Sequence, residues 1–194
     1  MAIVVVGGSG RGVGKTALVC GLIAALPEFQ WAAVKIASHE HGQGEAIWEE
    51  SDSAPDVGQG TDTARYLAAG AQRAFLVTPD LHSSSPVTGF PFLLGELWSK
   101  LGPGAHVLIE SNRILQYLKP DLCLLVDGGP AGRKASFTFA FGHGDALVAH
   151  AGADETIGGG EQSKPIFHLA TLERISAQMT AWVRERLGAE PGAA

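Results

Sequence analysis

A glycine-rich segment close to the start of the chain combines residue types that can hold phosphate. Residues 8–16 read GSGRGVGKT, which matches the pattern G-x-x-x-x-G-K-[ST] except that Ser9 stands at its first position. Glycines let backbone N–H groups turn toward phosphate oxygens, Lys15 can contact the β- and γ-phosphates, and Thr16 can offer its hydroxyl to Mg²⁺. A nucleoside triphosphate is therefore the predicted ligand, and its predicted contacts are Gly10, Arg11, Gly12, Val13, Gly14, Lys15, Thr16 and Ala17.

Three acidic residues stand where a magnesium ion could use them. Glu110 follows the apolar run HVLI, Asp127 follows DLCLLV, and Asp62 precedes a predicted helix. Carboxylates at the carboxyl ends of parallel strands face the ligand crevice, and Mg²⁺ prefers oxygen ligands. We expect Thr16, Asp62 and Glu110 to hold Mg²⁺. Lys15, Asp62 and Glu110 are the predicted catalytic residues, whereas a solvated or capping role is the stronger interpretation of Asp127.

A cluster of polar residues follows the second predicted strand. Lys35 lies at the end of this strand, and His39 and His41 come shortly after it with an acid between them. Contact with a substrate or proton transfer is one interpretation of Lys35, His39 and His41, and an exposed polar loop is the other. A metal site or metal chaperone is the weakest interpretation, because no second cluster of ligands is evident.

The elements that must position these residues alternate between strand and helix. Apolar runs predict strands at 2–6, 30–36, 73–78, 106–109, 121–126, 145–149 and 165–169. Helices are predicted at 15–26, 61–70, 90–101, 113–118 and 171–187, with Thr61 capping the second. Residues 37–60 and 79–89 are predicted loops, the pattern is unclear from 128 to 163 apart from the strand at 145–149, and residues 157–163 resemble a flexible loop. This alternation predicts a three-layer α/β fold of the P-loop NTPase type, with a mainly parallel sheet and helices on both faces.

Length, charge and composition narrow the classes of function. The chain has 194 residues, which suits one domain (1–187) and a short flexible tail (188–194). Its net charge of -6, without a basic run, argues against nucleic acid as a partner. We expect no membrane association, because no apolar stretch reaches membrane-span length, and the N-terminus lacks the basic region of a signal peptide. Cys20 and Cys123 lie in apolar runs and do not indicate a disulfide framework, so we expect a location in the reducing cytoplasm.

Two further segments bring the sequence close to a known family. Residues 34–41 (VKIASHEH) and 62–71 (DTARYLAAGA), together with the GVGKT loop, resemble the molybdopterin-guanine dinucleotide biosynthesis protein B family. That family is related to dethiobiotin synthetase and the nickel-inserting GTPases. The resemblance implies GTP binding with slow hydrolysis, an accessory role in attaching a guanine nucleotide to the molybdenum cofactor, a molybdenum-cofactor protein as partner, and a homodimer.

The resemblance covers residues 1–127 and leaves alternatives open. Glu110 is followed by Ser111 and Asn112 where the family usually has a glycine, and no N-K-x-D motif for guanine is present. The GVGKT loop and the strand-end glutamate also look like dethiobiotin synthetase, in which Thr16, Asp62 and Glu110 would form the magnesium set. An ATP-dependent ligase or kinase acting on a small molecule is therefore one alternative, with the 37–60 loop covering its substrate. A nucleotide-gated adaptor protein is another.

Overall fold

The centre of the molecule is one twisted β-sheet. The computed structural model describes residues 1–37, 46–50, 60–79, 90–129, 133–151 and 164–188. Within these residues the strand order is β3-β4-β2-β5-β1-β6-β7-β8, and every pair is parallel except β3 with β4. The strands are β1 (Ile3–Gly8), β2 (Ala32–Ile36), β3 (Ile47–Glu49), β4 (Arg73–Val77), β5 (Val107–Glu110), β6 (Leu122–Val126), β7 (Ala146–His150) and β8 (Ile166–Leu169).

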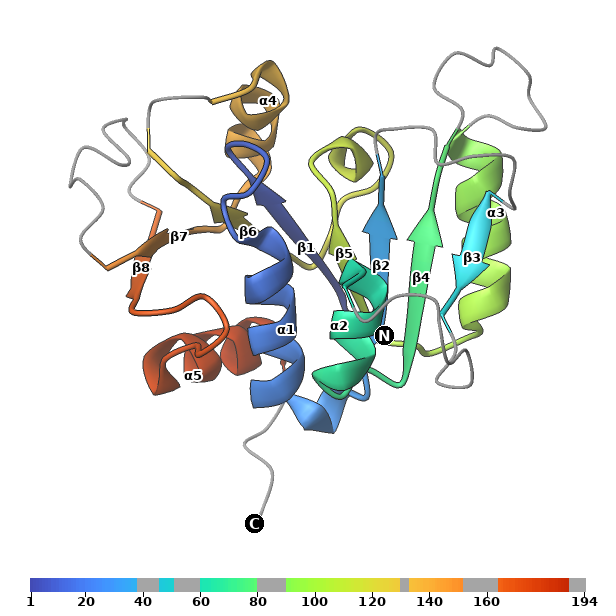
Figure 1. The fold of residues 1–194 in the computed structure, drawn as a ribbon, viewed down its shortest axis with the longest axis horizontal. Helices are drawn as coiled ribbons and strands as arrows, with labels where there is room; N and C mark the ends of the chain where they lie inside the picture. Colours follow the sequence, from blue (N-terminus) through green and yellow to red (C-terminus); the bar gives the residue numbers. More distant parts are fainter. Residues whose placement is uncertain (38–45, 51–59, 80–89, 130–132, 152–163, 189–194) are drawn as a thin grey trace.

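Helices cover both faces of this sheet. They are α1 (Lys15–Ala25), α2 (Asp62–Ala68), α3 (Phe90–Leu101), α4 (Ala135–His143) and α5 (Ala177–Arg186), with 3-10 turns η1 (Pro27–Phe29) and η2 (Arg113–Gln116). The helices α1, α2 and α5 lie on one face of the sheet, and α3, η2 and α4 lie on the other (Figure 1). The buried apolar side chains of each group pack against the sheet. The predicted three-layer α/β architecture is thereby confirmed.

The strand register places a row of side chains across one face of the sheet. Trp48 of β3 pairs with Leu76 of β4, Leu76 pairs with Lys35 of β2, and Lys35 pairs with Glu110 of β5. Residues in register on neighbouring strands project to the same face, which is here the face that carries α1 and α2. This row begins at the glycine-rich loop and ends at the edge strand β3.

Some elements differ from the sequence prediction. The strand β3 lies inside the segment predicted as a loop, because its three residues pair with β4 and acquire structure only from that partner. The helix α4 occupies part of the stretch that showed no clear pattern. The last helix begins at Ala177 and not at residue 171, since the Ser176 side chain caps it by accepting a hydrogen bond from the Met179 N–H.

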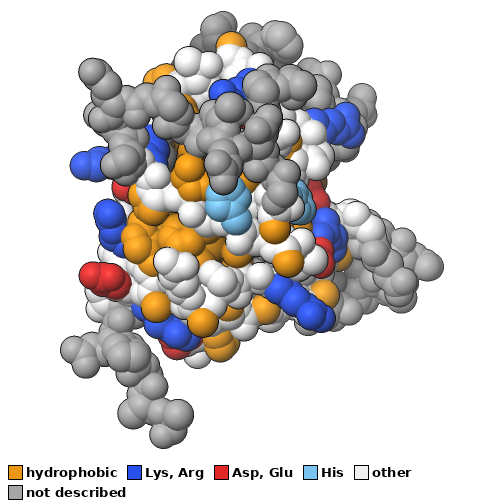
Figure 2. All heavy atoms as spheres, turned by 90° about the vertical axis from the view of Figure 1, so that its left-hand side faces the viewer, with side chains coloured by type: hydrophobic (Ala, Val, Ile, Leu, Met, Phe, Trp, Pro, Cys, Tyr) orange, Lys and Arg blue, Asp and Glu red, His pale blue; other side chains and the backbone are white. Residues whose placement is uncertain are grey.

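The β8 side of the molecule carries apolar surface. Figure 2 shows hydrophobic side chains gathered there with histidine side chains beside them. Ile166 of the edge strand β8 is 36% exposed.

None of the helices in the described part of the chain has the length and apolar character needed to cross a membrane.

Candidate phosphate and magnesium site

The glycine-rich loop connects β1 to α1 and adopts backbone angles that favour glycine. Gly12 and Gly14 have φ values of 73° and 96°, in the left-handed region, and Gly14 is the N-cap of α1. A side chain at Gly14 would also clash with Leu172, because an added Cβ would overlap the Leu172 Cδ1. The Lys15 ammonium reaches across the loop and donates to the Gly10 carbonyl at 2.7 Å. The loop is thus curled around the lysine at the N-terminus of a helix, as a phosphate cradle requires.

Ser9 has a structural role at the position where the pattern has glycine. Its hydroxyl accepts a hydrogen bond from the Gly128 N–H at 2.9 Å, and its own N–H donates to the Val126 carbonyl at 2.9 Å. The Ser9 carbonyl accepts from the Lys134 N–H at 3.0 Å. The serine side chain therefore adds a hydrogen bond to Gly128, just after β6, while the Ser9 backbone joins the loop to the end of β6 and to Lys134 before α4.

Asn112 holds the start of the loop, and the sequence analysis did not identify this role. Its amide oxygen accepts from the Gly8 N–H at 2.7 Å, and its amide nitrogen donates to the Gly8 carbonyl at 2.9 Å. Gly7 lies so close that an added Cβ would be 2.6 Å from the Asn112 Oδ1. The available signal was its place two residues after Glu110, in the Ser111-Asn112 segment where the sequence departs from the resembled family.

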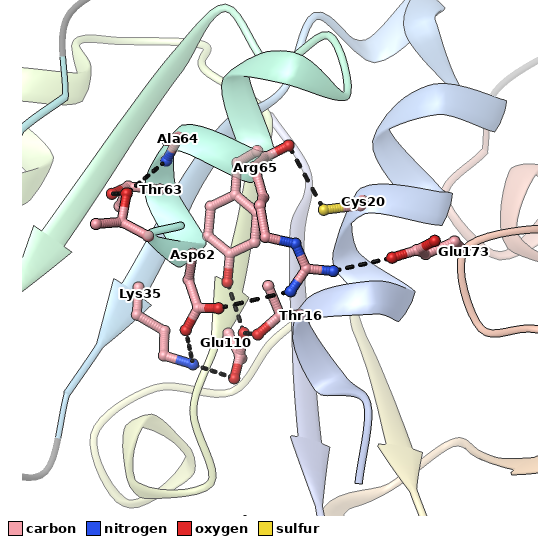
Figure 3. A network of polar contacts seen from close by, with 11 residues as sticks. Thr16, Cys20, Lys35, Asp62, Thr63, Ala64, Arg65, Glu110 and Glu173 are labelled. Carbon is pink, nitrogen blue, oxygen red and sulfur yellow. Dashed lines mark hydrogen bonds and ion pairs between the residues drawn. The ribbon is translucent and has the colours of Figure 1, made fainter. Parts of the chain in front are cut away.

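Glu110 is the central acid of the site. Its side chain is only 2% exposed at the carboxyl end of β5. The Thr16 hydroxyl donates to Oε2 at 2.8 Å, the Tyr66 hydroxyl donates to the same oxygen at 2.6 Å, and Lys35 forms an ion pair with Oε1 (Figure 3). A carboxylate this deeply buried needs such partners, because the charge would otherwise be strongly unfavourable. Tyr66, inside the DTARYLAAGA run, is a site residue that the sequence analysis did not single out.

Asp62 joins the same network from the N-terminus of α2. Its carboxylate pairs with the Lys35 ammonium at 2.8 Å and lies 3.9 Å from Arg65, which also pairs with Glu173 at 2.9 Å. Burial raises the pKa of Asp62, but the hydrogen bond and charge of Lys35, together with smaller effects of Thr16 and Arg65, outweigh burial and leave the pKa below its usual value. Figure 3 shows Lys35 between the two carboxylates. Asp62 is therefore ionised in the folded protein at neutral pH.

Burial also changes the acid–base properties of two other groups. The pKa of Lys15 is lowered, chiefly by burial, although Glu110 opposes this change. The pKa of Tyr66 is raised well above its usual value by burial and by the charge of Glu110, so its hydroxyl stays protonated and remains a donor. The site thus holds a partly buried cation in the loop and a neutral phenol against the central acid.

The donor set suits magnesium. Thr16, Asp62 and Glu110 contribute a hydroxyl and two carboxylates, all hard oxygen ligands, to the region where the Lys35 ammonium now lies between the acids. The two carboxylates already pair with the positively charged Lys35 ammonium, so their negative charge also suits a metal ion. No group of three or more His, Cys, Asp and Glu side chains with metal-site spacing occurs within the described ranges. Two carboxylates suffice for Mg²⁺ when phosphate oxygens and water complete its coordination.

The remaining predicted residues lie apart from this cluster. Asp127 is buried and pairs with Arg133, while its Oδ1 accepts from the Gly129 N–H at 3.1 Å. This arrangement orders the turn after β6, so Asp127 is neither the solvated acid nor the helix cap that the sequence analysis favoured. Arg11 is exposed in the loop. His39 and His41, the predicted substrate contacts beside Lys35, lie outside the described residues.

A cavity of about 520 Å³ opens beside Lys35, on the side away from the glycine-rich loop. Its lining comes from β2, β3, β4 and the start of α2, and consists of Lys35, Ala37, Trp48, Glu50, Gly60, Thr61, Asp62, Thr63 and Leu76. Volumes of 300–1,000 Å³ are typical of small-molecule sites. The cavity shares Lys35 and Asp62 with the acid cluster, so a molecule in it would lie next to the phosphate end of a bound nucleotide.

Comparisons with known proteins identify the fold. No family model matches the sequence, and a search of curated proteins gave no match. Among solved structures, LpxK from Aquifex aeolicus, crystallised in complex with ATP, is similar with a TM-score of 0.52 and 19% identity. The match covers 86% of this chain and 53% of LpxK, so the chain spans about half the length of that protein. A MobB protein homolog from Bacillus stearothermophilus has a TM-score of 0.50 and 16% identity, over 97% of this chain and 99% of the homolog. The chain therefore has the fold of the P-loop NTPases.

Proposed function

We propose that this protein binds a nucleoside triphosphate with Mg²⁺ and hydrolyses it slowly. The observation that carries the proposal is the convergence of Lys15, Thr16 and Glu110 at the end of a glycine-rich loop between a buried strand and a helix. Loop and helix supply backbone N–H groups and the positive end of the helix dipole to the phosphates. Thr16 and Glu110, together with Asp62, would hold Mg²⁺.

Each side chain has a role that follows from its surroundings. Lys15 would leave the Gly10 carbonyl and contact the β- and γ-phosphates as a point charge. The magnesium ion would neutralise phosphate charge when bound. Tyr66 keeps Glu110 oriented by donating to it, and Asn112 keeps the loop in register with β1. Catalysis in such a site is mainly positioning and electrostatic stabilisation.

The resemblance of residues 34–41 and 62–71 supports a more specific proposal. On that basis the nucleotide is GTP, and the protein assists in forming the guanine dinucleotide form of the molybdenum cofactor, as a homodimer with a molybdenum-cofactor protein as partner. Light scattering tests the dimer. A nucleotide panel of GTP, ATP and CTP in thermal-shift assays tests the base, because the preferred ligand raises apparent stability most.

Calorimetry of a Lys15→Ala variant tests the phosphate site. We expect Mg²⁺-dependent binding of the preferred triphosphate to fall by at least about tenfold, since a charge-assisted contact is lost. Lys100→Ala, which removes an exposed lysine from α3, is the matched control and should bind normally. Unchanged affinity in Lys15→Ala would refute the site assignment.

The cavity beside Lys35 favours a second candidate function, phosphoryl transfer from ATP to a small molecule. Lys35 lines the cavity and also pairs with both acids of the magnesium set, so it connects the two regions. An enzyme of this kind needs such a neighbouring volume, whereas simple hydrolysis does not. Formation of a phosphorylated small molecule in equal amount to ADP would favour this function over hydrolysis.

A further inference from the structure

We propose that the cavity lined by Trp48, Leu76 and Glu50 binds a small planar molecule with N–H donors on its edge, of the amidine or amino-heterocycle class. The inference deepens the proposed function, on which it rests for the presence of a triphosphate on the other side of Lys35. It assigns a second ligand to the same site. The ligand's N–H groups would meet Glu50, and its ring would lie on Trp48.

The cavity lies along the row of side chains that crosses the sheet. Trp48, Leu76 and Lys35 stand on three adjacent strands in matching register, and Glu110 stands on the next strand. With neighbouring strands about 4.8 Å apart, the backbones carrying Trp48 and Glu110 are separated by roughly 14 Å. A ligand the size of a bicyclic ring therefore reaches from Trp48 to Lys35, and one end of it lies beside the phosphate site.

The Trp48 side chain offers a partly exposed aromatic ring. Its side chain is 48% exposed although it lines the cavity, and Leu76 lies next to it on β4. Aromatic rings pack favourably in offset-stacked pairs, and an exposed indole beside an aliphatic side chain offers such a contact. Trp48 and Leu76 therefore favour a ligand with a flat, apolar ring.

Glu50 supplies the polar recognition. It is 8% exposed, and its Oε2 accepts hydrogen bonds from Thr63 at 2.7 Å and Thr61 at 3.4 Å. Its Oε1 has no hydrogen-bond partner among the described residues. Because Oε2 already accepts two hydrogen bonds, Oε1 is the oxygen that an N–H donor of the ligand would meet, and a hydrogen bond to a charged acceptor is stronger than one between neutral groups.

The balance of charge selects against an anionic ligand. Glu50 and Asp62 line the cavity with Lys35, and the ammonium of Lys35 is already shared by Asp62 and Glu110. Acidic groups are therefore in excess around the cavity. A neutral or cationic donor is favoured over a carboxylate of the same shape, because the anion would meet unpaired negative charge.

Isothermal titration with simple probes tests the proposal on the full chain. We expect 2-aminobenzimidazole and benzamidine to bind, and benzoate, which is flat but anionic, to bind at least about tenfold more weakly. Glu50→Gln keeps an oxygen that can accept from Thr63 but removes the charge, and should weaken the amidine by about tenfold or more, the range for a charge-assisted hydrogen bond. Trp48→Ala should weaken both ring probes several-fold.

Controls separate this inference from the proposed function. Glu49→Gln, which alters an exposed acid on the same strand that pairs with Arg73, should leave probe affinity unchanged. Lys15→Ala should lose triphosphate binding and retain the amidine. Equal binding of benzoate and benzamidine, or unchanged amidine affinity in a Glu50→Gln variant with a native circular dichroism spectrum, overturns the inference. Amidine binding that depends on Glu50 in a protein that binds no triphosphate would support the cavity assignment and refute the proposed function.

Discussion

The hydrogen bond between Tyr66 and Glu110 provides a sharp test of how the site is assembled. Tyr66 is fully buried, and its hydroxyl donates to Glu110 Oε2 at 2.6 Å. The Tyr66→Phe change removes only this oxygen, and Thr16 remains a donor to the same carboxylate oxygen. A hydrogen bond to a charged group contributes about 1.5–3 kcal/mol, so we expect the free energy of unfolding to fall by that amount.

Chemical and thermal denaturation followed by circular dichroism measures this change. For a domain of this size the loss corresponds to a decrease in Tm of about 3–12 °C. The only other tyrosine, Tyr117, is 45% exposed and packs its ring on Phe90, which makes Tyr117→Phe the matched control. That variant should change stability by less than about 0.5 kcal/mol, as surface substitutions usually do.

A double-mutant cycle with Glu110→Gln separates the pair from other effects. Because the hydrogen bond joins the two side chains, the loss caused by Tyr66→Phe should shrink once Glu110 is neutralised, with a coupling energy of about 0.5–3 kcal/mol. A Tyr66→Phe protein as stable as the wild type would refute the reasoning. Strictly additive effects of the two substitutions would do the same.

Three further predictions concern the support of the glycine-rich loop by Asn112, the ion pair between Asp62 and Lys35, and the buried thiol of Cys123. The Asn112→Ala change removes two hydrogen bonds to Gly8 and should lower the free energy of unfolding by about 1–3 kcal/mol in urea titrations. It should also weaken triphosphate binding in calorimetry. Unchanged binding would show that the loop does not need this support. The folded-state pKa of Asp62 lies below its unfolded value near 3.8, so its stabilising contribution is present above that pH and is lost as the pH falls through the folded value. Asp62→Asn should therefore be less stable than wild type at pH 7, with a difference that narrows below about pH 4 in unfolding titrations; a constant difference would argue against the ion pair. Burial raises the pKa of Cys123 to about 12. At pH 8 about one thiol in 10⁴ is then ionised, and mass spectrometry should find Cys123 alkylated by iodoacetamide only after unfolding.

The sequence predicted the elements whose signals are local. The strand, glycine-rich loop and helix at 2–26 follow from β-branched residues, glycines and an apolar helix face, all within one short segment. Thr61 was predicted to cap its helix, and it accepts a hydrogen bond from the Ala64 N–H. The edge strand β3 and the helix α4 were missed, because three residues of strand and a helix rich in aromatic residues carry weak local preferences. Their structure comes from the partners they pack against.

The tertiary structure alone decided how the candidate site is put together. The sequence identified Lys15, Thr16, Asp62 and Glu110 by residue type and by their places at strand and helix ends, and it grouped the last three as a magnesium set without showing their contacts. Only the strand order β2-β5-β1 brings Lys35 against Glu110, 75 residues away, and sets both beside the loop. Tyr66 and Asn112 gained their roles in the same way, since hydrogen bonds between residues 44 and 104 positions apart leave no spacing pattern in the chain. Residue types determine which chemistry is available, and strand pairing determines which groups meet.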